Sequence, residues 1–220
     1  MLRPTLFSLV FVVLAMGPLT SVSANDDTSK VNGSIRIDDG QTVGDLDTVN
    51  GSIRLGDHGK AEEVSTVNGS IDIGDDASIR TAGTVNGRIA LGKRVRVSGE
   101  VDTVNGSLTL DEGGDVSGDV SNVNGTIRLN NAHVGGAIKT VSGDIEIGAD
   151  SRVDNGIHVE KSSSWFNWGS DKPVQVVIGP RAVVKGKLVF ERTVELHVSD
   201  SAQIGEVTGA TAIKFSGDHP

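Results

Sequence analysis

An Asn-Gly pair recurs along this chain at an almost constant distance, and this period restricts the fold more than any other feature of the sequence. The segment "TVNGSIRLG" at Thr48–Gly56 returns with small changes every 18 or 19 residues. A fixed period of this length is typical of a solenoid in which each repeat forms one coil. An array of β-hairpins would need a pair of strands between turns, and the repeat is too short to hold them.

Apolar residues divide each repeat into three parts. From Ile37 to Val97 an apolar residue occurs every six residues, and a second set begins at Ile35, two residues before one position in three. Alternation of apolar and charged residues, as in Ile53-Arg54-Leu55, is typical of β-strands. The sequence therefore predicts an all-β fold: a right-handed, three-faced parallel β-solenoid with about 18 residues per coil and about nine coils.

Each Asn-Gly pair is expected to form a corner of its coil. Glycine would supply the positive φ that the corner needs, and asparagines stacked in register would hydrogen-bond along the axis. The valine before each pair belongs to the six-residue series and is expected to point into the core. The predicted corner ladder consists of Asn32, Gly33, Asn50, Gly51, Asn68, Gly69, Asn86, Gly87, Asn105, Gly106, Asn124 and Gly125.

The chain divides into four segments. Residues 1–24 have the pattern of a signal peptide, in which Arg3 precedes a short apolar run and small residues precede a cleavage site after Ala24. Residues 25–160 are expected to form the main solenoid with seven coils, residues 161–173 an aromatic loop insertion, and residues 174–220 the final coils and a C-terminal cap. We expect a periplasmic or secreted protein without a transmembrane segment after cleavage.

Composition excludes several classes of function. The formal net charge of −9 argues against nucleic acid as a partner, because an acidic chain repels phosphates. The chain has no cysteine, which excludes disulfides and thiolate metal sites. Aromatic residues make up only 3% of the sequence, so a core must be built from valine, isoleucine, leucine and alanine.

No set of residues has the spacing of a catalytic, cofactor or metal site. The five histidines occupy different positions of the repeat and are expected at the surface: His58, His133, His158, His197 and His219. An acidic row follows one strand of several repeats, as at Asp57 and at Asp75-Asp76. It would either bind divalent cations such as calcium or form a solvated row that discourages edge pairing. We expect no cofactor, no metal and no catalytic residue.

The segment "SSSWFNWGS" at Ser162–Ser170 is the main exception to the repeat. It contains Trp165, Phe166 and Trp168, three large aromatic residues in a chain that has few elsewhere. Two interpretations remain open at this point. The aromatic side chains would either pack on the flank of the solenoid or form an exposed anchor for a protein partner or a sugar.

Two families resemble parts of this chain. The pattern Ile-Gly-x-x-Ala in "IGDDAS" and "IGPRAV" is similar to the hexapeptide repeat of left-handed β-helix acyltransferases, but on only one face of each coil. The coils "TVNGSIRLG…V" from Val31 to Val159, with "VVIGPRAVVKGKL" after the loop, resemble bactofilin-like polymer-forming proteins and the related bacterial adhesin families of β-strand repeats. This resemblance implies a small right-handed solenoid that can stack end to end.

These observations predict a non-catalytic structural or adhesive protein of the bacterial envelope. Its partner would be a second copy, added at the open edge of a terminal coil, or an envelope protein or glycan. A monomer with capped ends is an alternative, since "ATAIKFSGDHP" could cap the last coil or extend it. The sequence is also compatible with a binding module that uses Trp165–Trp168 and, with less support, with an acyltransferase or a polysaccharide lyase.

Overall fold

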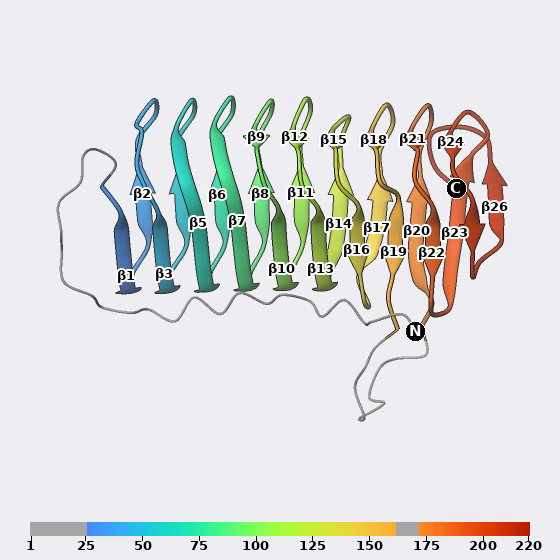
Figure 1. The fold of residues 1–220 in the computed structure, drawn as a ribbon, viewed down its shortest axis with the longest axis horizontal. Helices are drawn as coiled ribbons and strands as arrows, with labels where there is room; N and C mark the ends of the chain where they lie inside the picture. Colours follow the sequence, from blue (N-terminus) through green and yellow to red (C-terminus); the bar gives the residue numbers. More distant parts are fainter. Residues whose placement is uncertain (1–25, 162–171) are drawn as a thin grey trace, which may run out of the picture.

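The chain folds into a straight rod of stacked coils, as a computed structural model of residues 26–161 and 172–220 shows (Figure 1). Within these residues the secondary structure consists of strands and turns, without helices. Every pairing between neighbouring strands is parallel. The fold is therefore a parallel β-solenoid of about ten turns, with about 18 residues in each turn.

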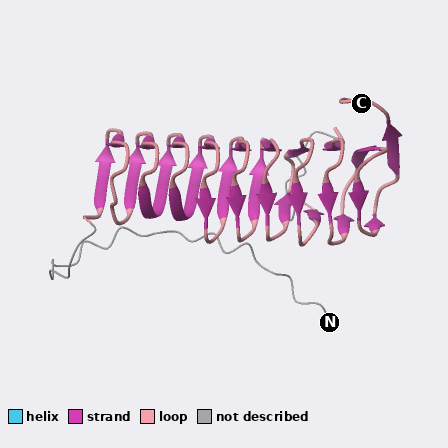
Figure 2. Ribbon diagram, turned by 90° about the horizontal axis from the view of Figure 1, so that it is seen from above, coloured by secondary structure: helices cyan, strands magenta, loops and turns pink. Residues whose placement is uncertain are grey.

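Each coil contributes strands to three faces of the rod, which Figure 2 shows from above. The isoleucine face is a separate ten-stranded sheet of β2 (Ile35–Ile37), β4 (Ile53–Leu55), β6 (Ile71–Ile73), β8 (Ile89–Leu91), β11 (Leu108–Leu110), β14 (Thr126–Leu129), β17 (Asp144–Ile147), β20 (Val174–Ile178), β23 (Val194–Ser199) and β26 (Ala212–Phe215).

The other two faces form one sheet, because two nine-residue strands, β5 (Lys60–Asn68) and β7 (Ser78–Asn86), continue from one face to the next. The short-strand face adds β9 (Arg96–Val97), β12 (Asp115–Val116), β15 (His133–Val134), β18 (Arg152–Val153), β21 (Val183–Val184) and β24 (Gln203–Ile204). The threonine face adds β1 (Thr28–Asn32), β3 (Leu46–Asn50), β10 (Val101–Asn105), β13 (Val120–Asn124), β16 (Ile138–Thr140), β19 (Ile157–Val159), β22 (Leu188–Phe190) and β25 (Val207–Thr208).

Equivalent residues of successive coils stand directly above one another and form columns. Ile35 pairs with Ile53, and Ile53 pairs with Ile71, so the same side chain type repeats along the axis. The two inward columns of the isoleucine face are almost completely buried from β4 to β23. Burial of this one continuous apolar cluster is the main driving force for stacking the coils.

The threonine face differs from the prediction, which had the valine before each Asn-Gly pair point inward. Val31 and Val67 are 56% and 40% exposed, whereas from the second coil onward the residue before this valine is buried, as at Thr48 and Thr66. The strand alternates strictly from Leu46 onward, so an inward leucine is followed by an inward threonine and an outward valine. The prediction was wrong because the six-residue period does not hold across this face.

The backbone takes positive φ at a different corner, which follows the isoleucine face. The column of residues with positive φ comprises Gly40, His58, Asp76, Arg94, Gly113, Asn131, Asp150 and Arg181. Only two of these eight residues are glycines, so the sequence carries no uniform signal for this turn. The stacked neighbours hold the conformation, which few non-glycine residues adopt without such support.

The stack continues across the segment that interrupts the repeat. Strand β20 pairs with β17, so Val176 lies directly on Ile145 although 31 residues separate them in the chain. At the C-terminal end, Ala212–Phe215 forms β26 and pairs in parallel with β23. This segment therefore extends the ladder by one strand and does not lie across the last coil as a cap. This last strand brings the isoleucine face to ten strands, one more than the nine coils expected.

No helix among the described residues has the length and apolar character needed to span a membrane.

One buried side chain in the threonine column lacks hydrogen bonds, and its replacement should stabilise the fold. Asn122 is 0% exposed, and neither its Oδ1 nor its Nδ2 has a partner among the described residues. Its neighbour in the column is Thr103, whose hydroxyl donates to a carbonyl of the previous coil. We expect Asn122→Thr to raise the free energy of unfolding by about 1–3 kcal/mol, because an unsatisfied buried amide is removed.

Urea unfolding of the two proteins would measure this difference. The reciprocal variant Thr103→Asn serves as the control and should lose a similar amount. Lower stability of Asn122→Thr than of the parent protein would contradict this account of the column.

Candidate interaction surfaces

The Asn-Gly corner is held by three sets of bonds between coils. Each asparagine Nδ2 donates to the Oδ1 of the asparagine one coil before, from Asn50 to Asn32 at 3.1 Å through to Asn124 to Asn105 at 3.0 Å. From Gly33 to Gly106, the N–H of each corner glycine donates to the carbonyl of the asparagine in the next coil. The buried threonine hydroxyls close the corner from inside by donating to glycine carbonyls of the previous coil, as Thr66 does to Gly51 at 3.0 Å.

Most corner glycines are required because a larger residue would not fit, and not because of positive φ as predicted. Gly33 and Gly125 have positive φ, but Gly51, Gly69, Gly87 and Gly106 do not. At these four positions a Cβ atom would overlap the carbonyl oxygen of the glycine in the previous coil. Glycine is therefore needed because two backbones approach closely along the stack, and the prediction of positive φ was wrong for these coils.

The acidic row forms a similar ladder. The Oδ1 atom of Asp39 accepts the N–H of Asp57 at 2.9 Å, Asp57 accepts that of Asp75 at 2.9 Å, and Asp75 accepts that of Lys93 at 2.8 Å. Each carboxylate thus satisfies a backbone donor of the next coil. Among the described residues, no group of three or more histidine, aspartate or glutamate side chains is arranged to hold a metal ion.

Two bidentate ion pairs occupy the column of positive φ. Arg94 donates to both carboxylate oxygens of Asp76 at 2.7 and 2.6 Å, and Arg181 does the same to Asp150. These hydrogen bonds lower the pKa of Asp76 and of Asp150. Both pairs are exposed, so they fix the register of neighbouring coils more than they stabilise the fold.

His133 lies between two carboxylates on the short-strand face. Its Nδ1 is 2.5 Å from Asp115 and its Nε2 is 3.1 Å from Asp154, whose other oxygen is 3.0 Å from Arg152. Partial burial lowers the pKa of His133, but the hydrogen bonds with Asp154 and Asp115 outweigh it and raise this pKa overall. This network links consecutive coils, and the separate positions of the histidines in the repeat gave no sign of it.

Asp102 is the most strongly perturbed acid. Burial, together with the nearby carboxylates of Glu100 and Glu63, raises its pKa to about 6. Its carboxylate accepts no hydrogen bond from the described residues, and the residue beside it in the previous coil is Gly83. The side chain therefore lies half-buried without a partner, in an acidic part of the threonine face.

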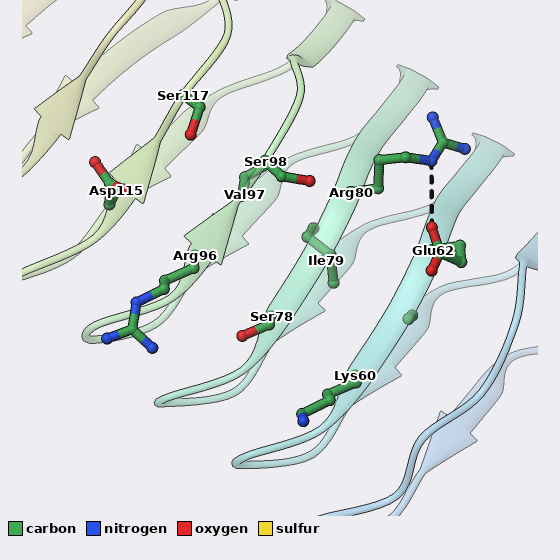
Figure 3. Close-up of a pocket in the computed structure, with 11 residues that line it drawn as sticks. Lys60, Glu62, Ser78, Ile79, Arg80, Arg96, Val97, Ser98, Asp115 and Ser117 are labelled. Atoms are coloured by element: carbon green, nitrogen blue, oxygen red, sulfur yellow. Dashed lines mark ion pairs between the residues drawn. The ribbon is translucent and has the colours of Figure 1, made fainter.

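A groove crosses the short-strand face over the second to fifth coils (Figure 3). Its volume is about 410 Å³, and serine hydroxyls and charged groups line it above buried residues such as Ile79. Arg80 lies 3.4 Å from Glu62. Lys60 and Arg96 line the same groove, and neither makes an ion pair with the described residues.

An apolar stripe follows the outer edge of the threonine face. It consists of the valines that precede each corner, Val31, Val49, Val67, Val85, Val104, Val123 and Val141, all partly or fully exposed. Neighbouring valines of the stripe cover one another along the stack, which suits β-branched residues. The predicted aromatic anchor, Trp165, Phe166 and Trp168, lies outside the described residues, as does the predicted signal peptide of residues 1–24.

Comparisons with known proteins give no relative. No protein-family model matches the chain, and neither a curated protein nor a solved structure is significantly similar to it.

The close approach at the corner leads to a prediction for glycine substitutions. We expect Gly87→Ala to lower the free energy of unfolding by about 3 kcal/mol, the upper part of the range for over-packing, because the backbone carbonyl of Gly69 cannot move away. Thermal unfolding would measure the loss. The matched control is Gly83→Ala, whose Cβ would meet only the Asp102 carboxylate, at 3.5 Å, and should change stability by less than about 1 kcal/mol. Equal effects of the two substitutions would contradict the steric explanation.

The raised pKa of Asp102 predicts a pH-dependent effect of removing its charge. Because the pKa is about 6 in the folded protein against an ordinary 3.8, the protonated acid favours folding at low pH, and this contribution is lost as the pH rises through 6. Asp102→Asn should therefore stabilise the protein by about 1–3 kcal/mol at pH 8 and have little effect near pH 3.5. Urea unfolding at both pH values measures this, and a gain that is the same at both would refute it.

Proposed function

We propose that this protein is a non-catalytic structural and adhesive rod of the bacterial envelope that binds through its sides. The first support for this proposal is that its repeated polar side chains are used to hold the coils together. The repeated asparagines, threonines and aspartates bond neighbouring coils, and they are thereby held in ladders rather than converging on a reacting group. Such ladders give a rod of fixed shape, which suits a scaffold.

The observation that carries the proposal is a lysine in an inward column at each end of the rod. In the first coil, Lys30 pairs with Thr48 and so occupies the inward column of buried threonines. In the last coil, Lys214 pairs with Val198 and so continues a column of buried aliphatic residues. Both lysines are exposed, and no coil of the described residues lies beyond either of them.

These lysines oppose end-to-end association. A second rod stacked on either end would bury an ammonium group in an apolar column, and burial of an unpaired charge is strongly unfavourable. Inward-pointing charges on terminal strands are a known means of preventing edge pairing. Lys30 also has a local role, since its Nζ donates to the carbonyl of Ser34 at 2.8 Å. We therefore favour a rod with closed ends over a self-assembling polymer.

The location in the envelope follows from the expected signal peptide of residues 1–24. An exported rod without cysteines needs no oxidative step to fold, because it has no disulfide to form. Its lateral faces are then the surfaces on which an envelope partner would bind.

Light scattering on size-separated protein tests the closed ends. The mature chain, Asn25–Pro220, should keep the mass of one chain over a wide range of concentration. The double variant Lys30→Thr, Lys214→Ile should form elongated species that grow with concentration, because both terminal columns then match those of the interior. Lys187→Thr removes an exposed lysine whose side chain is outward and should behave like the parent. Concentration-dependent growth of the parent protein would overturn the proposal.

A further inference from the structure

We propose that the groove on the short-strand face binds a linear acidic polysaccharide with its chain along the rod axis. This inference rests on the proposed function and assigns a ligand class to one lateral face. The groove extends across β5, β7, β9 and β12, so it runs along the stack rather than around a coil (Figure 3). An elongated site of this kind suits a polymer better than a compact metabolite.

The cations of the groove are spaced like the charges of a sparsely charged glycan. Lys60 pairs with Ser78 and Ser78 pairs with Arg96, so the two cations stand in one column, two strands apart. Two strand spacings correspond to about 9.5 Å. This separation is close to the length of a disaccharide, so a polysaccharide with one carboxylate in every second sugar would place an anion near each cation.

The two cations are available for a ligand. Many basic side chains of the described residues are paired, as Arg94 is with Asp76 and Arg128 is with Glu146, whereas Lys60 and Arg96 make no ion pair within these residues. Arg96 can form a bidentate pair with a carboxylate, which gives orientation as well as affinity. The short-strand face thus offers free positive charge in an otherwise acidic protein.

Neutral parts of the groove also match a sugar chain. Ser78, Ser98 and Ser117 line it and can exchange hydrogen bonds with sugar hydroxyls, whereas Ile79 and Val97, only 4% and 1% exposed, belong to the core beneath the groove. Figure 3 shows Ser78 between Lys60 and Arg96, and Ser98 between Arg80 and Ser117.

The acidic rim of the groove selects against densely charged polymers. Glu62 and Asp115 line the groove at its two ends. A nucleic acid carries a phosphate at every nucleotide and would meet these carboxylates, whereas a glycan with widely spaced carboxylates can avoid them.

Binding of labelled hyaluronan fragments, in which every second sugar is a glucuronate, tests the inference. We expect saturable binding by the mature protein, weaker binding as salt is raised, and weaker or no binding of chitin fragments of equal length or of single-stranded DNA. Lys60→Ser and Arg96→Ser should each reduce the affinity on the order of tenfold, because each removes one charge-assisted contact. Arg54→Ser changes the same charge on the isoleucine face and should leave the affinity unchanged.

Circular dichroism and the unfolding temperature would establish that all three variants keep the fold. Absence of hyaluronan binding, equal loss in Arg54→Ser, or tighter binding of DNA would each overturn the inference. If the parent protein stays monomeric and binds no hyaluronan, the assignment of this ligand is refuted, but the proposal of a closed rod still holds. An increase in the mass of the parent protein with concentration, measured by light scattering, would instead refute the proposed function. This conclusion would hold whether or not the protein binds hyaluronan.

Discussion

The close approach of successive coils at the Asn-Gly corner is the constraint on which the rest of the structure depends. Parallel strands stack at about 4.8 Å, and at this corner the backbones leave no room for a Cβ atom. Glycine is thus required by the stack itself. The asparagine beside it bonds to its own equivalents, and the buried threonine satisfies a glycine carbonyl inside the corner. A departure such as Asn122 leaves polar atoms unpaired, because the column has room for only one pattern of bonds.

The same constraint decides where function can reside. Positions that must match their neighbours above and below become uniform columns, and their polar groups are used in bonds between coils. Positions that face solvent can vary from coil to coil. The column Lys60, Ser78, Arg96, Asp115, His133 and Arg152 on the short-strand face changes its chemistry at every step. This variation places the cations Lys60 and Arg96 beside the hydroxyl of Ser78. Such a combination of groups can bind a ligand specifically, which the uniform columns cannot do.

The sequence predicted the architecture because the period of the repeat is a property of every coil at once. The solenoid, its approximate coil length and the inward isoleucines of Ile53 and Ile71 are all confirmed. The threonine face was predicted incorrectly, since hydrophobicity alone favours valine over threonine for the core. What places Thr66 inside is the carbonyl of Gly51, a partner 15 residues away that appears only once the coils are stacked. The positive φ of Arg94 and Asp150, and the groove around Arg96, likewise depend on contacts between coils rather than on local sequence.

The stacking of equivalent coils also determines which side chains the terminal coils need. A solenoid built from equivalent coils has no inherent end, since each new coil gains the same contacts as the last. A closed rod therefore needs side chains that fit a terminal position and no interior one. Lys30 and Lys214 meet this condition, because each occupies an inward column where solvent can still reach the ammonium group. The proposed closed rod would bind other molecules along its length, and Lys60 and Arg96, which make no ion pair with the described residues, lie on such a lateral face.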